Sequence, residues 1–174
     1  MLYSLISAAL ISLFTVSSAF AYSTGPKWQF DNVLYKNSAT SFDTPIYNAA
    51  ATWNSAAKFK IYNSSSATHY WNASNYGGVG GIVGITSSKQ LNGILWYCNS
   101  DFNTYQSFST SGTPSSSQFD AQSVALHEFG HWLQLNDLTS SSNSSSIMYY
   151  MIGKGTVKRA LTTDDINGDK ALYP

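Results

Sequence analysis

Two histidines and a glutamate lie within five residues of each other in a chain that has few side chains suited to acid–base or metal chemistry. They are His127, Glu128 and His131, in the segment VALHEFGHWLQLND (124–137). Glu128 is the only glutamate among 174 residues, and the chain has one further histidine. Residues four apart share one face of a helix, so both imidazoles can bind the same metal ion. The intervening carboxylate is then placed to act as a general base on a zinc-bound water.

A partly buried helix whose histidines only form hydrogen bonds is the alternative interpretation of this segment. The helix is expected independently, because apolar side chains recur at helical spacing: Val124, Ala125, Phe129, Trp132 and Leu133. A polar pair and the sole glutamate have no packing role on such a helix. The pattern therefore favours zinc.

A catalytic zinc needs a third protein ligand and one open position. No glutamate follows Glu128, so the candidates are the remaining histidine and the later acids, namely His69, Asp137, Asp164, Asp165 and Asp169. We favour Asp137, because a sharp turn after Leu135 would bring it back to the ion. Asp164 and Asp165 follow two threonines, which predicts a helix start with capping and dipole interactions instead. His69 is expected to be an ordinary strand or loop residue.

The flanking segments predict the elements that must position these residues. Strand-like patterns occupy 27–36, 59–66, 68–74, 79–88 and 93–102, the fourth being glycine-rich and also compatible with a loop. One helix is expected after Thr44–Pro45, a second from Asp120 to about Leu135, and a third from Thr162. The order predicts a single α+β domain with a mixed, twisted sheet of about five strands and three helices.

Three blocks of the sequence, in order from Asp120 to Pro174, carry a family resemblance. HEFGHWLQLND resembles the metzincin signature H-E-x-x-H-x-x-G-x-x-H, with Asp137 as third ligand, as in the snapalysin group of secreted bacterial metzincins. SSIMYY (145–150) resembles the Met-turn, which would place Met148 beneath the zinc as a hydrophobic floor. LTTDDINGDKALYP (161–174) resembles the last helix of matrixin catalytic domains. The resemblance implies a zincin-like fold and a matrixin-like metalloprotease domain over residues 22–174.

Two positions depart from the matrixin pattern near the expected zinc. Gln134 replaces the glycine of the signature, and a non-glycine residue in the left-handed region costs about 1 kcal/mol. Alternatively, the helix continues to Asn136 and Asp137 approaches differently. Tyr150 stands where matrixins have proline. Astacins and serralysins have tyrosine at this offset, which implies that Tyr150 polarises the scissile carbonyl or binds zinc; the alternative makes it a wall of the side-chain pocket.

The sequence has few residues left for a second metal ion and a single cysteine. Matrixins carry an additional structural zinc held by several histidines, and with only His69 spare this site is expected to be absent. A calcium ion held by Asp101, Asn103 and backbone carbonyls is left open. Cys98 cannot form an internal disulfide and is interpreted as a small buried hydrophobe rather than a regulatory thiol.

The first 21 residues have the character of a signal peptide. No charged side chain precedes Lys27, and Ala19-Phe20-Ala21 forms a small-x-small cleavage site after the apolar run. A retained membrane anchor is the alternative. We expect a secreted, extracellular protein that is monomeric and not stably membrane-bound after processing. Formal net charge is zero and no Lys/Arg cluster is present, which excludes nucleic acid as an expected partner.

The leading hypothesis is a secreted zinc endopeptidase that acts on proteins or peptides. The substrate would lie along residues 79–86 and extend the edge of the sheet by backbone hydrogen bonds. A non-catalytic, secreted zinc-binding or adhesion module is the alternative from another class; such a structural site would close its fourth position with a protein ligand. A zinc amidase acting on cell-wall peptides is the third hypothesis.

Overall fold

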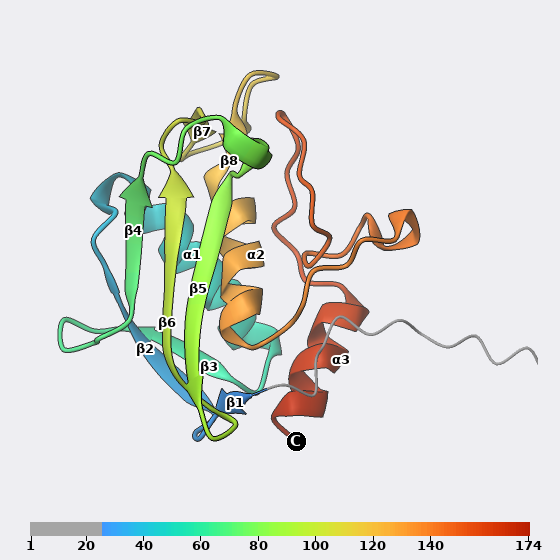
Figure 1. Ribbon diagram of the computed structural model, residues 1–174. Helices are drawn as coiled ribbons and strands as arrows, with labels where there is room; N and C mark the ends of the chain where they lie inside the picture. Colours follow the sequence, from blue (N-terminus) through green and yellow to red (C-terminus); the bar gives the residue numbers. More distant parts are fainter. Residues whose placement is uncertain (1–25) are drawn as a thin grey trace, which may run out of the picture.

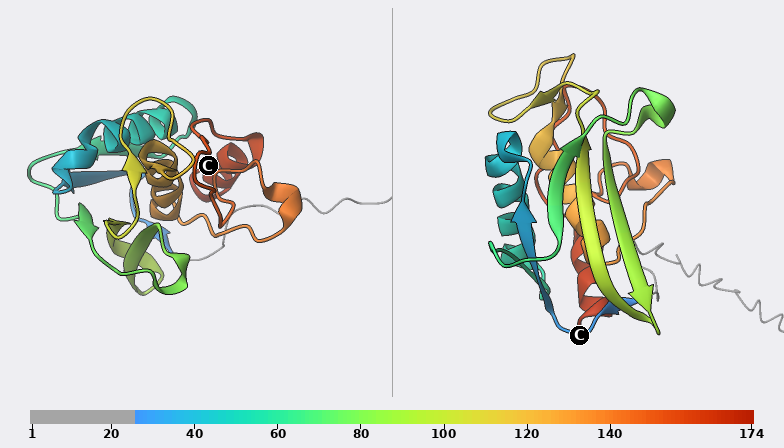
Figure 2. Two further views of the ribbon diagram at one scale, coloured as in Figure 1. Left: turned by 90° about the horizontal axis from the view of Figure 1, so that it is seen from above. Right: turned by 60° about the vertical axis from the view of Figure 1, so that its left-hand side comes forward.

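A mixed β-sheet packs with one face against two long helices in the computed structural model, which describes residues 26–174 (Figure 1). The predicted signal peptide lies outside the described residues. The two helices are α1 (Asp43–Ala56) and α2 (Ala121–Trp132), and they pack against each other as well as against the sheet. A third helix, α3 (Thr163–Leu172), ends the chain. The view from above in Figure 2 shows the segment that follows α2 beside this helix, on the flank away from α1.

The sheet has one antiparallel strand, and this strand forms its edge. The order across the sheet is β3 (Lys60–Asn63), β2 (Asn32–Asn37), β4 (Tyr70–Ser74), β6 (Ile94–Asn103) and β5 (Gly84–Leu91). Every pairing is parallel except that of β5 with β6. A short sixth strand, β1 (Lys27–Trp28), pairs with the beginning of β6. The expected α+β fold with a mixed sheet and three helices is confirmed.

Large aromatic side chains fill the space between the sheet and the helices. Those with no exposed surface include Trp53, Trp71, Phe102, Phe129 and Trp132. Trp53 on α1 donates its indole N–H to the carbonyl of Leu126 on α2, at 2.9 Å. Burial of each such ring stabilises the fold by about 1.5–3 kcal/mol. The helix that carries His127 and His131 is therefore held rigidly by its opposite face.

Three predicted boundaries were wrong, each for a conformational reason. The segment 27–36 is split by a bend into β1 and β2. The segment 79–88 is a strand only from Gly84, because Gly80 and Gly81 have φ values of 66° and 68°, which a strand cannot accommodate. Residues 79–81 instead form a short helical turn. Helix α2 ends at Trp132, before the predicted Leu135.

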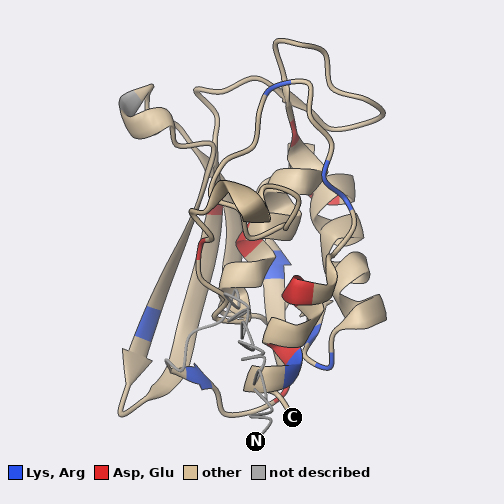
Figure 3. Ribbon diagram, turned by 90° about the vertical axis from the view of Figure 1, so that its right-hand side faces the viewer, with Lys and Arg blue, Asp and Glu red and all other residues tan. Residues whose placement is uncertain are grey.

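Two short strands, β7 (Phe108–Ser109) and β8 (Phe119–Asp120), pair in parallel just before α2. Charged residues are dispersed over the elements rather than gathered into one patch (Figure 3). Within residues 26–174, no helix combines the length and apolar character needed to cross a bilayer.

Candidate metal site

The N-terminus of α2 is fixed by a buried carboxylate that pairs with a partly exposed arginine. Asp120, fully buried, is the N-cap and accepts hydrogen bonds from the backbone N–H and hydroxyl of Ser123, at 2.8 and 2.6 Å. Arg159 pairs with the same carboxylate, its Nε lying 3.0 Å from Oδ1. Burial alone would raise the pKa of Asp120, but Arg159 and Ser123 lower it below its usual value. The predicted cap is present, and a distant arginine reinforces it.

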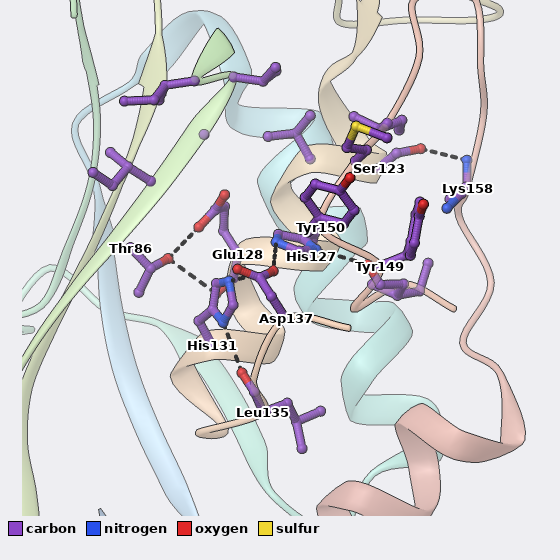
Figure 4. A pocket seen from close by; sticks show the side chains of 18 of the residues that line it. Thr86, Ser123, His127, Glu128, His131, Leu135, Asp137, Tyr149, Tyr150 and Lys158 are labelled. Carbon is purple, nitrogen blue, oxygen red and sulfur yellow. Dashed lines mark hydrogen bonds and ion pairs between the residues drawn. The ribbon is translucent and has the colours of Figure 1, made fainter. Parts of the chain in front are cut away.

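The structure brings His127, His131 and Asp137 together. Asp137 Oδ1 lies 3.3 Å from Nε2 of His127 and 3.6 Å from Nε2 of His131 (Figure 4). Ligand atoms of the three residues all fall within 4.8 Å of one another. No other group of three His, Cys, Asp or Glu side chains in residues 26–174 meets this criterion. The other third-ligand candidates do not belong to this group; they are His69, Asp164, Asp165 and Asp169.

The hydrogen bonds of the two imidazoles leave the correct nitrogen free for a metal. Nδ1 of His127 is 2.8 Å from the carbonyl of Ile147, and Nδ1 of His131 is 2.8 Å from the carbonyl of Leu135. A carbonyl only accepts, so the ring proton of each neutral histidine is on Nδ1. Each Nε2 then keeps its lone pair and faces the carboxylate of Asp137. Two such nitrogens and one carboxylate oxygen form a donor set that fits zinc.

The electrostatics at this point favour a cation. Burial lowers the pKa of His127, but hydrogen bonding to Asp137 and the charge of Glu128 outweigh it, so its pKa is raised. When His127 is protonated, its Nε2–H donates to Asp137, and this hydrogen bond lowers the pKa of Asp137 in spite of partial burial. Both shifts have the direction expected where a positive charge at His127 is stabilised by the carboxylate of Asp137.

A helix-ending turn built on Gln134 directs Asp137 back toward the histidines. Gln134 has φ of 66°, the left-handed value expected for the glycine that it replaces. Leu135 N–H donates to the carbonyl of Gly130 and Gln134 N–H to that of His131, at 3.1 and 3.0 Å, which is the Schellman pattern. Of the two routes that the sequence left open, the helix therefore ends early and does not continue to Asn136.

The turn at Gln134 predicts that Gln134→Gly is more stable than Gln134→Ala. Both variants lose the Gln134 side chain, but only glycine relieves the left-handed strain, by about 1–2 kcal/mol. The more flexible unfolded chain of the glycine variant costs about 0.4–1 kcal/mol, so we expect a net difference of about 0.5–1 kcal/mol. Urea unfolding at one fixed zinc concentration measures it. Gln134→Ala is the control, since it keeps the strain and loses the 3.1 Å side-chain bond to the His131 carbonyl. Equal unfolding free energies for the two variants would contradict the strain argument.

The Met-turn residue packs directly against α2. Met148 is fully buried, and a Cβ added at Gly130 would lie 2.2 Å from its sulfur, so only glycine at this helix position admits it. The sequence predicted Met148 as a hydrophobic floor for the metal. The structure places it below the helical turn that joins His127 to His131, and its role toward a metal stays a prediction.

Helix α3 holds the Met-turn through a buried carboxylate. Asp165 accepts the hydroxyl of Ser146 at 2.6 Å, together with the backbone N–H of Ile147 at 3.2 Å. It also closes the capping box of Thr162, with two contacts of 2.7 Å. Since the carbonyl of Ile147 orients His127, the cap of α3 acts on the metal site through a continuous set of hydrogen bonds.

Glu128 faces a cleft of about 750 Å³ that runs past the histidines. One wall is formed by residues 80–86 and the other by residues 149–152, with α2 at the base (Figure 4). Glu128 is 4% exposed, and the hydroxyl of Thr86 donates to its Oε2 at 2.6 Å. Tyr150 is half exposed on the second wall, with its ring against that of Tyr149. Its position beside the site is compatible with both interpretations from the sequence.

Three further residues that could bind metal, His69, Cys98 and Asp169, lie outside the group formed by His127, His131 and Asp137. Nδ1 of His69 accepts the backbone N–H of Cys98 at 3.4 Å, and burial lowers its pKa, which keeps this ring neutral. Cys98 is fully buried, and burial followed by the charge of Glu128 raises its pKa well above the usual range. A neutral, enclosed thiol is unreactive. Asp169 accepts the backbone N–H groups of Lys58 and Phe59, which ties α3 to the start of β3.

The amide of Asn103, considered for calcium, is fully engaged by the protein itself. Its oxygen accepts from the backbone of Tyr76 and Tyr105, and its nitrogen donates to the carbonyls of Gly77 and Ile82, at 2.9–3.1 Å. Both donors and both acceptors are used. Asn103 therefore fastens the loop that precedes β5, a role that the sequence did not predict.

Comparison with known proteins points to one family. A family model described as Matrixin matches residues 22–174. Metalloendoproteinase 1 of Glycine max is 31% identical over 164 residues, which cover 90% of this chain and 51% of that protein. Metalloendoproteinase 2-MMP of Arabidopsis thaliana is 48% identical over 54 residues, or 31% of this chain and 14% of that protein. The chain thus spans about half the length of the first relative and matches a small part of the second.

Proposed function

The chain belongs to the matrixin family of peptidases, and on that premise we propose that it is a zinc-dependent endopeptidase that hydrolyses peptide bonds in proteins or peptides. One observation supports the proposal above the others. Two imidazole Nε2 atoms and the Asp137 carboxylate converge at the base of an open cleft, with Glu128 beside them. A closed structural site would have a fourth protein ligand at the same point.

In this proposal His127, His131 and Asp137 hold the zinc. When bound, zinc polarises the carbonyl of the scissile bond and makes a water molecule more acidic. The carbonyl groups of Ile147 and Leu135 hold the two rings in the metal-binding tautomer and orientation. The Schellman turn at Gln134 brings in the carboxylate, and the Met-turn supports the helix from below.

Glu128 is proposed as the general base. It takes the proton from the attacking water as the oxygen bonds to the scissile carbon, and then delivers that proton to the leaving amine nitrogen as the C–N bond breaks. Tyr150, on the opposite wall, is proposed to donate its phenolic O–H to the developing oxyanion. The half-exposed position of Tyr150 at the cleft is what supports this role.

The substrate is proposed to bind as an additional strand. Among residues 26–174, β5 pairs only with β6, which leaves its other edge available for backbone hydrogen bonds along the cleft. The side chain after the scissile bond would enter the space between α2 and residues 149–152. In place of the whole stretch 79–86, the part from Gly84 onward provides the extended edge, because the strand begins there.

Secretion, processing after Ala21 and a monomeric state belong to the same proposal. The small-x-small sequence at 19–21 supports secretion and processing, as does the family match that begins at residue 22, directly after the predicted cleavage site.

Hydrolysis of casein or gelatin by residues 22–174 tests the proposed function. We expect cleavage that a chelator removes and stoichiometric zinc restores, with zinc content measured on the same samples. Protein that retains one zinc per chain but cleaves neither substrate nor a peptide library would support the non-catalytic module instead. Cleavage confined to cell-wall peptides would support the amidase.

A further inference from the structure

We propose that Thr86 is a positioning residue for Glu128, holding one carboxylate oxygen through a hydrogen-bonded chain that starts at Trp132 and leaving the other oxygen for proton transfer. The inference deepens the proposed function and rests on it, because it assigns separate roles to the two oxygens of the proposed base.

The chain of hydrogen bonds crosses three elements. The indole N–H of Trp132, on α2, donates to the hydroxyl of Ser100, on β6, at 2.7 Å. The hydroxyls of Ser100 and Thr86 are 2.6 Å apart, and these residues are direct partners in the β5–β6 pairing. Thr86 Oγ1 lies 2.6 Å from Oε2 of Glu128, as the dashed line in Figure 4 marks. Trp132 and Ser100 have no exposed surface, so this part of the chain is shielded from water.

Only one direction of donation satisfies every member when Glu128 is ionised. An indole nitrogen can only donate, and a carboxylate can only accept. The proton of Thr86 must therefore go to Glu128, since otherwise two acceptors would face each other at 2.6 Å. The proton of Ser100 then goes to Thr86, because the single hydroxyl proton of Thr86 is already donated to Glu128. Aligned in this way, each bond polarises the next and strengthens the last one, which ends on Oε2.

The second oxygen of Glu128 lies against a glycine of the same strand. A Cβ added at Gly84 would be 2.5 Å from Oε1, so the missing side chain is what gives this oxygen its space. Gly84 and Thr86 are two apart on β5 and point to the same face. One therefore makes room for Oε1 while the other holds Oε2. In the described part of the chain no hydrogen bond is made to Oε1, which we assign as the proton-carrying oxygen.

Glutamate has three rotatable bonds, and without a fixed contact its carboxylate would sample several positions in the cleft. The longer contact of Thr86, 3.3 Å to the backbone carbonyl of Glu128, cannot replace the one to Oε2, because it does not restrain the side chain. Displacement of a catalytic group by about 1 Å can cost 10²-fold in rate. Loss of the Thr86 hydroxyl should thus reduce the rate of the chemical step and leave substrate binding intact.

The test compares Thr86→Val, which keeps the shape and removes the hydroxyl, with Thr86→Ser, which keeps the hydroxyl. We expect Thr86→Val to lower kcat by about 10- to 100-fold with KM within about twofold and zinc content unchanged. Thr86→Ser should restore kcat to within a few fold of wild type. Thr68→Val, the same change at an exposed threonine that does not line the cleft, is the matched control and should leave both constants unchanged.

A second measurement is independent of activity. Because Glu128 is the only glutamate, carbon-13 labelling of glutamate gives a single side-chain signal. The expression tag must then contain no glutamate. The order parameter of its side-chain carbons should be high in wild type and Thr86→Ser, and low in Thr86→Val. Equal order in all three, or equal kcat losses in the Val and Ser variants, would overturn the positioning role. A wild type that cleaves no peptide would instead refute the proposed function, and the labelled signal would still decide the role of Thr86.

Discussion

Glu128→Gln is expected to lower kcat for peptide hydrolysis by about 10²–10⁴-fold, the range contributed by a positioned general base, while zinc stays bound. Glutamine has the shape of glutamate and keeps an oxygen that can accept the 2.6 Å hydrogen bond from Thr86, so the packing is preserved. What is lost is the ability to accept a proton. Because Glu128 is not among the three converging ligand groups, the zinc content should match that of the wild type.

Steady-state kinetics on a fluorogenic peptide and metal analysis of the same preparations measure this prediction. Asp31→Asn, which neutralises a surface acid, is the matched control and should be fully active. If Glu128→Gln retained activity within tenfold of wild type, another group would have to be the base. If it lost zinc, Glu128 would have to be a ligand, and the proposed roles would need to be exchanged.

Asp137→Ala is expected to reduce zinc affinity by more than the ~10–100-fold that follows removal of a residue that only orients a ligand. It removes the only carboxylate among the converging ligand groups, the one that lies 3.3 and 3.6 Å from the two imidazole nitrogens. It also removes the negative charge that, with Glu128, raises the pKa of His127, so protons and zinc would both be held less tightly at that ring.

Competition against a chromophoric chelator gives the zinc affinity. The pH must be kept fixed, because protons and zinc compete for the same imidazole nitrogens. Asp31→Ala serves as the control for removal of an acid. Unchanged zinc affinity in Asp137→Ala would show that another group completes the ligand set. Loss of activity with full zinc retention would assign Asp137 to catalysis instead.

The two variants also separate the alternative functions. A non-catalytic zinc module predicts that Asp137→Ala destabilises the fold and that Glu128→Gln changes nothing measurable. The proposed endopeptidase predicts an effect of both variants on hydrolysis, with zinc loss confined to Asp137→Ala. The pair therefore tests ligand and base independently.

Local patterns in the sequence were sufficient for the helices and for the residues considered as ligands. The predicted N-caps at Asp120 and Thr162 are present, since a cap depends on hydrogen bonds within three residues. The pairing of His127 with His131 follows from the helical repeat alone. The distance of Asp137 from His131 in the sequence favours it as third ligand, and the structure brings it to the same point because the helix ends in a turn of defined geometry.

The tertiary structure alone decided which distant groups complete the site. Thr86 lies 42 residues from Glu128 and Ser100 lies 32 residues from Trp132, so no periodicity links them. Likewise, helix propensity alone disfavours Gly130. The structure gives the reason for glycine at this position, because the sulfur of Met148 lies where a Cβ would be. The sequence allows two conformations at Gln134, and the structure shows the left-handed one, which brings Asp137 back to the histidines. Helix caps and helical faces arise from interactions within a few residues. The environment of the Glu128 carboxylate arises from strand pairing and from packing between elements, which the local sequence does not encode.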